Sequence, residues 1–535
     1  MNTNTKFHEY SKECPFKSVE DIKNKHITIM GLGLNGGGEA AVRFFLQKGA
    51  YVLVTDMKTQ EQLQPTIDRL NEDKTIDTSR LTYRLGEHQV SDFETADCVI
   101  KNPGIKYEGN KYLAAAKAIE TDLSIFLRFT DCPIIAVTGS KGKSSTVSAI
   151  HYGLRTAGYD AYLGGNITVS PLTFFDKVNK DTPVVIEFSS WQLADLRGRG
   201  ILKPHISIIT KIVPDHQNWY GNMEDYVSDK RLIYKNQNKD DYSIFDAESD
   251  EPGTEPDKKL HNGITSWGNL FAKESCANNT KVLRYGRAPL EKTPEGKTTY
   301  GVWLEDKDDG TYCGKVLLPE MKEPETILTG LSVPGEHMKI NALNAALVLY
   351  LMGVPAKKTA EIMKSWPGID HRLQYFHSWT NSKKTTFKFY NDSCATVPES
   401  VVEATQAFGK SVFLATGGTA KGLDLAPMVN LLTQKGQLNA LNENGIIPVR
   451  SIYLLEGTAT DKLIPELEKA HIKFHGPFPS MNTLLQRARE ILDTKEPTAS
   501  EEIFVLSPGA TSFGMFANEF DRGNKYMDGV KKLFN

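Results

Sequence analysis

The strongest constraint on the fold is a pattern that occurs three times along the 535 residues. Each time, an apolar, β-branched run leads into a glycine-rich turn and then into a helix-like stretch. The three segments are HITIMGLGLNGGGEAAVRFF, PIIAVTGSKGKSSTVSAIHYGL and SVFLATGGTAKGLDLAPMVNLL. Repeated strand–turn–helix units form mainly parallel sheets covered by helices. The sequence therefore predicts an α/β protein with three domains, since a core usually takes about 150 residues.

Helix breakers and a change of composition divide the chain. We expect three domains, over residues 1–121, 122–367 and 368–535. Pro367 and Gly368 mark the second boundary, where they end a helical stretch. Residues 248–328 begin polar and proline-rich and later alternate around the turn residues Asp309 and Gly310. This segment is predicted to be a hairpin-bearing insertion in the central domain.

Charge and hydropathy restrict the class of partner. The chain carries 63 Lys and Arg against 66 Asp and Glu, so we expect no basic surface that binds nucleic acid. No apolar run approaches the roughly 20 residues of a membrane-spanning helix, and the first residues carry no secretory signal. We therefore expect a cytoplasmic protein without a membrane span. Its six cysteines are scattered, which fits neither a disulfide framework nor a cysteine zinc site.

The first glycine turn is typical of a dinucleotide-binding fold. In that fold the turn admits a pyrophosphate at a helix N-terminus, and an acidic side chain at the end of the next strand binds a ribose hydroxyl. A second loop, after a later strand, is predicted to close the same crevice. Both loops also fit plain turns without a ligand. The candidate residues are Gly31, Gly33, Gly36 and Asp56 in the first unit, and Asn102, Pro103 and Gly104 in the second loop.

The second glycine turn predicts an ATP site. Backbone N–H groups between a buried strand and a helix can cradle phosphates, Lys143 can reach the terminal phosphates, and Ser144 can bind Mg²⁺. Val137 stands where the full P-loop pattern has a glycine, so a plain turn with a solvated lysine is the alternative. The candidate ATP-binding residues of this loop are Gly139, Ser140, Lys141, Gly142, Lys143, Ser144 and Ser145.

Two later strands end in candidate metal ligands. The strand PVVIEF contains Glu187 near its end, and the strand ISIIT leads to Asp215 and His216. Because parallel strands end at one edge of a sheet, Glu187 and His216 are expected beside the nucleotide, as an oxygen and a nitrogen ligand for a metal. Taken singly, each also fits a solvated strand-end carboxylate or a loop histidine without a ligand.

Taken together, the motifs resemble the Mur ligase family. In chain order they are TGSKGKSS, GGNI, EFSSWQL, PDH, YVSDKRLIYKNQ, PGEHMKINALNAA, GIDHRL, NDSCAT, TGGTAKGLD and LSPGATSFGMF. The resemblance covers nearly the whole chain, apart from the N-terminal extension and residues 248–328. It implies a Rossmann-like first domain for a UDP moiety, a central P-loop-type domain for ATP and Mg²⁺, and a Rossmann-like third domain for an amino acid.

The resemblance also implies the reaction. ATP would phosphorylate a substrate carboxylate to an acyl phosphate, and an incoming amine would displace the phosphate to form an amide. The expected substrates are UDP-N-acetylmuramoyl-L-alanine and D-glutamate, in peptidoglycan precursor synthesis for cell-wall growth and division, with a monomeric enzyme. Two alternatives stay open: a Mur-type ligase for a different amino acid, and a nicotinamide-dependent oxidoreductase built on the GLGLNG turn, which leaves the central motifs unexplained.

Matched motif by motif, the resemblance assigns further site residues. Two Mg²⁺ ions are implied, one bound by Ser144 and Glu187 and the other by His216 and Lys230. Lys230 would be carbamylated, which gives it a carboxylate-like oxygen; a surface ion-pair lysine is the alternative. Lys143 completes the catalytic set. The other implied residues are Asn341, His371, Arg372 and Asp392 for ATP, Asn166, Ser189 and Gln192 for the muramoyl part, and Thr396, Lys421, Ser512 and Phe513 for the amino acid.

Four residues depart from the family pattern. Met338 and Val397 stand at usual asparagines, Cys394 at a usual lysine, and Glu519 at a usual phenylalanine. The last three belong to motifs of the amino-acid site, so they bear on the choice of amino acid more than on amide formation. A Glu519 carboxylate that faced this site would repel a dicarboxylate.

Overall fold

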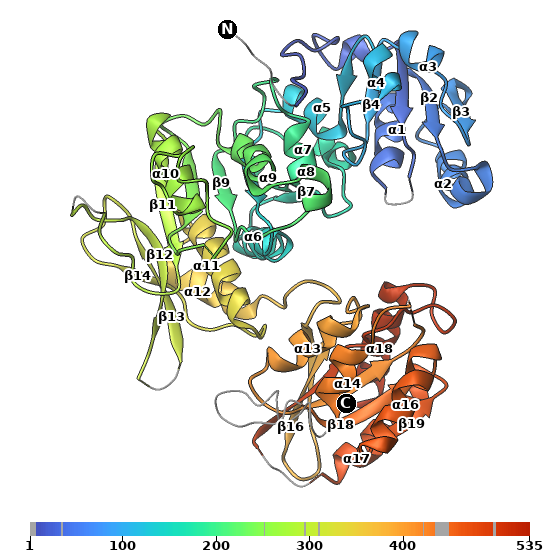
Figure 1. Ribbon diagram of the computed structural model, residues 1–535, viewed down its shortest axis with the longest axis vertical. Coiled ribbons are helices and arrows are strands. Elements are labelled where there is room, and N and C mark those ends of the chain that lie inside the picture. Colours follow the sequence, from blue (N-terminus) through green and yellow to red (C-terminus); the bar gives the residue numbers. More distant parts are fainter. Residues whose placement is uncertain are drawn as a thin grey trace. The chain divides into compact units, whose positions relative to one another are not determined.

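The structure, a computed structural model, describes residues 7–33, 36–250, 252–293, 296–308, 311–420, 422–433, 449–495 and 499–535. This part of the chain forms helices around three mainly parallel sheets, which confirms the predicted α/β class (Figure 1). By its internal contacts the chain splits into two compact units. One unit comprises Met1–Thr329 and Ile340–Met363, and the other comprises Gly330–Lys339 and Lys364–Asn535.

The first sheet is parallel and has the strand order β3-β2-β1-β4-β5. The strand order reverses at β1, which pairs with β2 on one side and with β4 on the other. In parallel sheets ligands bind beyond the carboxyl ends of the strands at such a reversal, which here lie just before Gly31 and Asn102. The strands are β1 His26–Met30, β2 Tyr51–Asp56, β3 Leu81–Leu85, β4 Cys98–Lys101 and β5 Ile119–Glu120. The helices are α1 Gly37–Gln47, α2 Gln60–Glu72, α3 Ser91–Glu94, α4 Lys111–Ala115 and α5 Asp122–Phe129.

Helix α1 lies unusually close to the glycine turn that precedes it. Its apolar face, which includes Val42 and Phe45, is buried against the sheet. Gly36 caps the helix with φ of +85°, a conformation that favours glycine. A Cβ atom at Gly38 would overlap the Leu32 carbonyl oxygen and lie 2.5 Å from the Gly31 carbonyl oxygen. The residue that permits this close packing is therefore Gly38, beyond the three glycines that the sequence pattern singled out.

The second sheet has nine strands in the order β14-β13-β12-β11-β10-β9-β6-β8-β7. Strand β6 lies between β8 and β9, and all residues of these three strands are buried, as expected where helices cover both faces. The strands are β6 Ile134–Thr138, β7 Tyr162–Gly165, β8 Val184–Glu187, β9 Ile206–Ile209, β10 Tyr242–Asp246, β11 Lys281–Gly286, β12 Gly301–Asp306, β13 Tyr312–Leu317 and β14 Glu325–Leu328. The associated helices are α6 Lys143–Ala157, α7 Ser190–Ala194, α8 Gln217–Tyr220, α9 Met223–Lys230, α10 Trp267–Ala277, α11 Glu336–Leu351 and α12 Ala356–Ser365.

Residues 248–328 extend this second sheet. Strand β11 pairs parallel with β10, and β12 pairs antiparallel with β13, so that Trp303 lies opposite Lys315 (Figure 1, yellow-green). These two antiparallel strands correspond to the predicted hairpin. Its expected turn residues, Asp309 and Gly310, lie outside the described residues.

The third sheet has the order β15-β16-β20-β17-β18-β19 and is parallel except for the β15–β16 pair. Apolar clusters around Phe504 and around Val505 show that the two faces of β20 are both covered. The strands are β15 Gln374–Thr380, β16 Thr386–Asn391, β17 Val412–Gly417, β18 Val449–Leu455, β19 His475–Phe478 and β20 Glu501–Leu506. The helices are α13 Pro398–Gln406, α14 Ala426–Leu432, α16 Thr458–Lys469, α17 Met481–Asp493 and α18 Glu519–Leu533.

The packing of α1 gives a prediction about two adjacent glycines. We expect Gly38→Ala to destabilise the protein by about 1–3 kcal/mol, because the added methyl group meets backbone oxygens that cannot move aside. Gly37→Ala is the matched control, since a Cβ atom there has open space, and it should change stability by less than about 0.5 kcal/mol. Thermal unfolding of both variants measures the difference. Equal melting temperatures would show that α1 is not packed in this way.

Candidate active site

The loop between β6 and α6 is tightly enclosed. Gly139 has φ of +144° and Gly142 has φ of +91°, and Gly142 caps α6. A Cβ atom at Gly139 would overlap the Thr210 hydroxyl, and one at Gly142 would lie 2.5 Å from Asn341 Oδ1. The loop therefore requires glycine at both positions, because Thr210 after β9 and Asn341 on α11 press against it. This contact places the predicted ATP residue Asn341 beside the loop.

Part of the loop backbone is already hydrogen-bonded. The N–H groups of Ser140 and Lys141 both donate to the Lys211 carbonyl oxygen, at 2.9 and 3.3 Å. The Ser140 hydroxyl contacts Val213 O at 2.8 Å and the Tyr226 hydroxyl at 2.9 Å. The groups best placed to receive a phosphate are consequently the N–H groups in the first turn of α6, where Ser144 and Ser145 lie and where the helix dipole favours an anion.

Lys143 lies against its own loop. Its Nζ donates to Gly139 O at 3.1 Å and to Ser140 O at 3.0 Å. Burial lowers the pKa of this lysine, while the carboxylates of Glu187 and Asp215 act in the opposite direction. The side chain is therefore partly buried and held near two acidic groups, which does not match the alternative of a freely solvated lysine.

Glu187, at the end of β8, is a buried carboxylate with one unpaired oxygen. The side chain is 1% exposed, and its Oε1 accepts a hydrogen bond from Asn166 Nδ2 at 2.9 Å. Its Oε2 is buried and has no hydrogen-bond partner among the described residues. Leaving a carboxylate oxygen buried without a donor costs free energy, and a cation would remove that cost. This orphaned oxygen fits the predicted metal ligand.

Lys230, the last residue of α9, is 1% exposed. Its Nζ donates to Gly139 O at 2.8 Å and lies 4.6 Å from the centre of the Tyr226 ring. Burial holds the pKa of Lys230 well below its ordinary value, and the nearby Lys143 ammonium lowers it further. The alternative of a surface ion-pair lysine is therefore wrong.

His216 lies in the same region, at the start of α8. It has φ of +50°, and its ring centre is 4.8 Å from the centre of the nearest Trp191 ring. Its Nε2 lies 3.7 Å from Asp215 Oδ2. The described residues contain no group of three or more His, Cys, Asp and Glu side chains able to hold a metal ion. A metal beside this loop needs other ligands as well, such as the Ser144 hydroxyl, phosphate oxygens or a modified Lys230.

Ser189 and Gln192, predicted to contact the muramoyl substrate, contact each other in the structure. They form a capping box at the start of α7: Ser189 Oγ accepts from Gln192 N at 3.2 Å, and Gln192 Oε1 accepts from Ser189 N at 3.0 Å. Their local effect is to fix the direction in which α7 leaves β8.

The predicted nucleotide-binding residues of the first sheet converge on the Gly31–Gly36 turn. Asp56 Oδ2 accepts hydrogen bonds from Leu32 N at 2.9 Å and from Gly33 N at 3.1 Å. Asn102 Nδ2 donates to Gly31 O at 2.7 Å, and Pro103 and Gly104 follow it in the second loop. Asp56 and Asn102 thus hold the turn from two strands of the sheet.

The third sheet carries a cavity of about 300 Å³ beyond the ends of β17 and β18. Its lining includes Ser512 and Phe513, the two residues assigned by resemblance to the amino-acid site, together with Thr419 and Arg522. Glu519 lies outside this lining, and its carbonyl oxygen accepts a hydrogen bond from the Ser393 hydroxyl at 2.7 Å. Thr396 also lies outside the lining, and Lys421 lies outside the described residues.

Arg522 is a cavity residue that the sequence did not reveal. It is 1% exposed, and its guanidinium donates to Ser393 Oγ, Ser393 O and Ala510 O. Burial lowers its pKa to about 10. The only signal in the sequence is an arginine one helical turn after Asn518, which caps α18.

The predicted ATP residues Asp392, His371 and Arg372 lie in the second compact unit. Asp392 Oδ1 accepts from Leu373 N at 3.1 Å and its Oδ2 accepts from Ser507 Oγ at 2.8 Å. Burial raises the pKa of Asp392 to about 7, although these donors and Arg372 oppose the rise. His371 has φ of +61°, and its Nδ1 lies 2.9 Å from Asn391 Nδ2.

The raised pKa of Asp392 predicts a pH dependence of stability. Between its ordinary pKa of 3.8 and about 7, the folded protein keeps a proton that the unfolded chain has lost. The contribution of this group to stability is thus present below pH 3.8 and is lost as the pH rises through 7. Asp392→Asn removes that loss, so its stability relative to the wild type should increase from pH 4 to pH 7 and then level off.

Thermal unfolding of both proteins across this pH range measures the effect. Asp229 and Asp246, whose pKa values burial raises to about 6, titrate in both proteins and cancel in the difference. A difference that does not depend on pH would contradict the prediction.

Two sequence families match this chain. Residues 137–349 match the Mur ligase middle domain, and residues 25–123 match the Mur ligase MurD-like N-terminal domain. The chain is 36% identical over 573 residues to the UDP-N-acetylmuramoylalanine–D-glutamate ligase of Treponema pallidum (strain Nichols), across 96% of this chain and 98% of the relative. It is 34% identical over 520 residues to the protein of the same name from Borreliella burgdorferi (strain ZS7), across 96% and 99% of the two chains.

Solved structures share the fold at low sequence identity. The UDP-N-acetylmuramate–alanine ligase MurC of Thermotoga maritima aligns with a TM-score of 0.50 and 16% identity, across 95% of this chain and all of that chain. MurF of Acinetobacter baumannii aligns with a TM-score of 0.50 and 13% identity, across 83% of this chain and 93% of that chain. No helix of the described residues is both long and apolar enough to cross a membrane.

Proposed function

The chain belongs to the Mur ligase family, and from this membership we propose that it joins D-glutamate to UDP-N-acetylmuramoyl-L-alanine with consumption of ATP, a step of peptidoglycan precursor synthesis. The observation that carries the proposal is the near full-length similarity to ligases of that name. A nicotinamide-dependent oxidoreductase is disfavoured, because it would leave the loop at Gly139 and the buried Lys230 without a role.

The central loop supplies the groups for phosphoryl transfer. We infer that the phosphates of ATP bind at the first turn of α6, and that Lys143 exchanges its contacts with Gly139 O and Ser140 O for phosphate oxygens. Glu187, with its orphaned oxygen, and Ser144 would hold the magnesium ion of the nucleotide. Mg²⁺ supplies charge that offsets the repulsion between phosphates and a carboxylate. A carboxylate is a poor electrophile, whereas its acyl phosphate has a leaving group that the incoming amine can displace.

Lys230 is proposed to be carbamylated. In that reaction the neutral amine nitrogen forms a bond to the carbon of CO₂ and a proton leaves, which yields a carbamate anion. Two observations support the proposal: the pKa of Lys230 lies well below its ordinary value, so that the amine is available as a nucleophile, and the side chain is buried beside Gly139. A carbamate oxygen, with His216, would hold a second magnesium ion.

The remaining residues are assigned to parts of the substrates according to the sheet near which they lie. We propose that the crevice around the Gly31–Gly36 turn, Asp56 and Asn102–Gly104 receives the UDP moiety, and that Asn166, Ser189 and Gln192 contact the muramoyl part. The cavity lined by Ser512 and Phe513 has room for an amino acid, with Thr396 and Lys421 as further contacts. Since Glu519 lies outside its lining, the expected repulsion of a dicarboxylate finds no support. Asn341, His371, Arg372 and Asp392 are proposed contacts of ATP.

Substrate-dependent phosphate release tests the function. We expect release only when ATP, Mg²⁺, UDP-N-acetylmuramoyl-L-alanine and D-glutamate are all present. L-glutamate and D-aspartate are the informative controls, because they change either the configuration or the length of the amino acid. Release with another amino acid but not with D-glutamate would establish a Mur-type ligase of different specificity. Tight NAD binding without phosphate release would overturn the ligase proposal.

Replacing Lys230 tests the carbamate. We expect Lys230→Ala to lose at least about 100-fold in kcat, because an alanine side chain cannot supply the carbamate oxygen. Formate or acetate, which can enter the vacated space as a carboxylate, should restore part of the rate. Lys180→Ala, which removes an exposed lysine of the same compact unit, is the control. Its kcat should equal that of the wild type, and formate or acetate should not change it. A Lys230→Ala enzyme with wild-type kcat would contradict the proposal of a second metal ion.

A further inference from the structure

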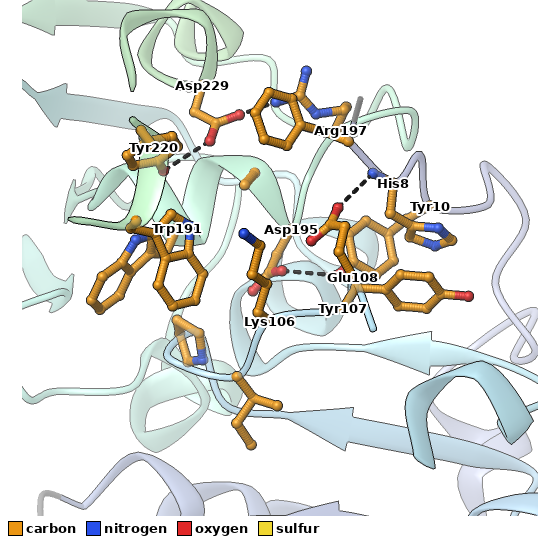
Figure 2. Close-up of a pocket in the computed structure, with 15 residues that line it drawn as sticks. His8, Tyr10, Lys106, Tyr107, Glu108, Trp191, Asp195, Arg197, Tyr220 and Asp229 are labelled. Atoms are coloured by element: carbon orange, nitrogen blue, oxygen red, sulfur yellow. Dashed lines mark hydrogen bonds and ion pairs between the residues drawn. The ribbon is translucent and has the colours of Figure 1, made fainter. Parts of the chain in front are cut away.

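Residues 7–12, which we call the N-terminal strap, lie across two parts of the first compact unit. Tyr10 N donates to Arg197 O at 2.9 Å, and the Tyr10 hydroxyl donates to Asp195 Oδ1 at 3.0 Å. A Cβ atom at Gly198 would lie 2.6 Å from Tyr10 O, so the segment after α7 is shaped to let the strap approach. On its other side, His8 N donates to Glu108 Oε1 at 2.8 Å, in the loop that follows β4 (Figure 2).

The same region contains a buried network between the first two sheets. Lys101 Nζ, at the end of β4, donates to Asp195 Oδ2 at 2.7 Å, and both side chains are buried. Arg128 of α5 donates to the strap at Lys12 O, at 2.8 Å, and to Glu120. The strap is thus held by charged groups from both sheets, rather than by one surface contact.

Arg197 connects the strap to helix α9. Its guanidinium lies 5.1 Å from the centre of the Phe7 ring and forms an ion pair with Asp229, whose side chain is 2% exposed. The other oxygen of Asp229 accepts from the Tyr220 hydroxyl at 2.8 Å, so Asp229 is held from two directions (Figure 2). Asp229 immediately precedes Lys230, and the end of α9 is therefore fixed at the residue before the proposed carbamate.

The space among these side chains is too small for a substrate. The cavity lined by the strap, Lys106, Trp191 and Asp229 has a volume of about 40 Å³. That volume holds ordered water but no sugar or nucleotide. Asp229, Arg197, Tyr220, Asp195 and Tyr10 contact each other around it, and Trp191 Nε1 and Arg197 Nε are buried without a hydrogen-bond partner among the described residues. Together with the small volume, these contacts favour a positioning role for this cluster over a substrate site.

We propose that Arg197 is a positioning residue for the ligase reaction. Braced by the N-terminal strap, it holds Asp229 and thereby the end of α9, so that the Lys230 side chain stays beside Gly139 and the ATP loop. The proposal rests on the proposed function, because it assumes that Lys230 carries a metal-binding carbamate. It gives the N-terminal extension, which lies outside the motifs shared with the family, a part in catalysis.

Four variants test the proposal. Arg197→Gln and Asp229→Asn should each lower kcat about tenfold, while the KM of the UDP-linked substrate changes by less than about twofold, because the crevice of the first sheet is untouched. The double variant should lower kcat no further than either single variant does, since the two residues act as a pair. Arg197→Lys keeps the charge and should recover part of the rate. Arg155→Gln, which breaks the exposed ion pair between Arg155 of α6 and Asp160, is the matched control and should behave as wild type.

Two further readouts separate positioning from mere stability. With ¹³C-bicarbonate, the carbamate signal in the NMR spectrum should weaken in Arg197→Gln and stay unchanged in Arg155→Gln. The Mg²⁺ concentration for half-maximal rate should rise in Arg197→Gln only. If Arg197→Gln fails to fold, Phe7→Ala removes only the ring over the guanidinium and should still lower kcat about threefold.

The outcomes are distinguishable. A wild-type kcat and a wild-type carbamate signal in Arg197→Gln would overturn the positioning role. Where Arg197→Gln does not fold, the same result in both Phe7→Ala and Arg197→Lys would overturn it. If wild-type protein shows no carbamate signal and Lys230→Ala is fully active, the proposed function of Lys230 fails, and the positioning role fails with it. An inactive Lys230→Ala beside a fully active Arg197→Gln would overturn the positioning role alone.

Discussion

Two lysine side chains converge on the carbonyl oxygen of Gly139, and the central part of the molecule depends on this contact. Lys143 Nζ and Lys230 Nζ donate to that oxygen at 3.1 and 2.8 Å. Burial disfavours the charge of Lys230, and the nearby Lys143 ammonium repels it, so the arrangement favours a neutral Lys230. A neutral amine close to the phosphate loop is the chemical requirement for the carbamate that we propose.

The parallel sheet explains why these groups meet. Strand β6 pairs in parallel with β8 on one side and with β9 on the other, so the Gly139 loop, Glu187 and Thr210 all lie at the carboxyl ends of strands, on one edge of the sheet. Helix α9 then adds Lys230 from outside the sheet, and its register depends on Asp229, Arg197 and the N-terminal strap. The order of the strands thus brings the reactive groups together, and the packing of the helices against each other and against the N-terminal strap aligns them.

Much of this was accessible from the sequence, because glycine turns after buried strands have a local physical cause. The α/β class and the position of the Gly139 loop between a buried strand and a helix agree with the expectations. Other features had no local signal. Gly38 rather than Gly36 permits the close packing of α1. Ser189 and Gln192 hydrogen-bond to each other in a capping box. Arg522, which lines a cavity, lies on α18, a helix that begins after the last of the family motifs.

By itself, the sequence determined where the glycine turns lie and which strands are buried, since turn composition and apolar runs are local features of the chain. It also carried enough ordered motifs to indicate the ligase family. Only the tertiary structure decided the state of Lys230, because its pKa depends on burial and on Lys143, which is 87 positions away in the chain. The pairing of Arg197 with Asp229 was likewise decided by packing, since a charged side chain in a sequence does not indicate which distant partner will remove it from water.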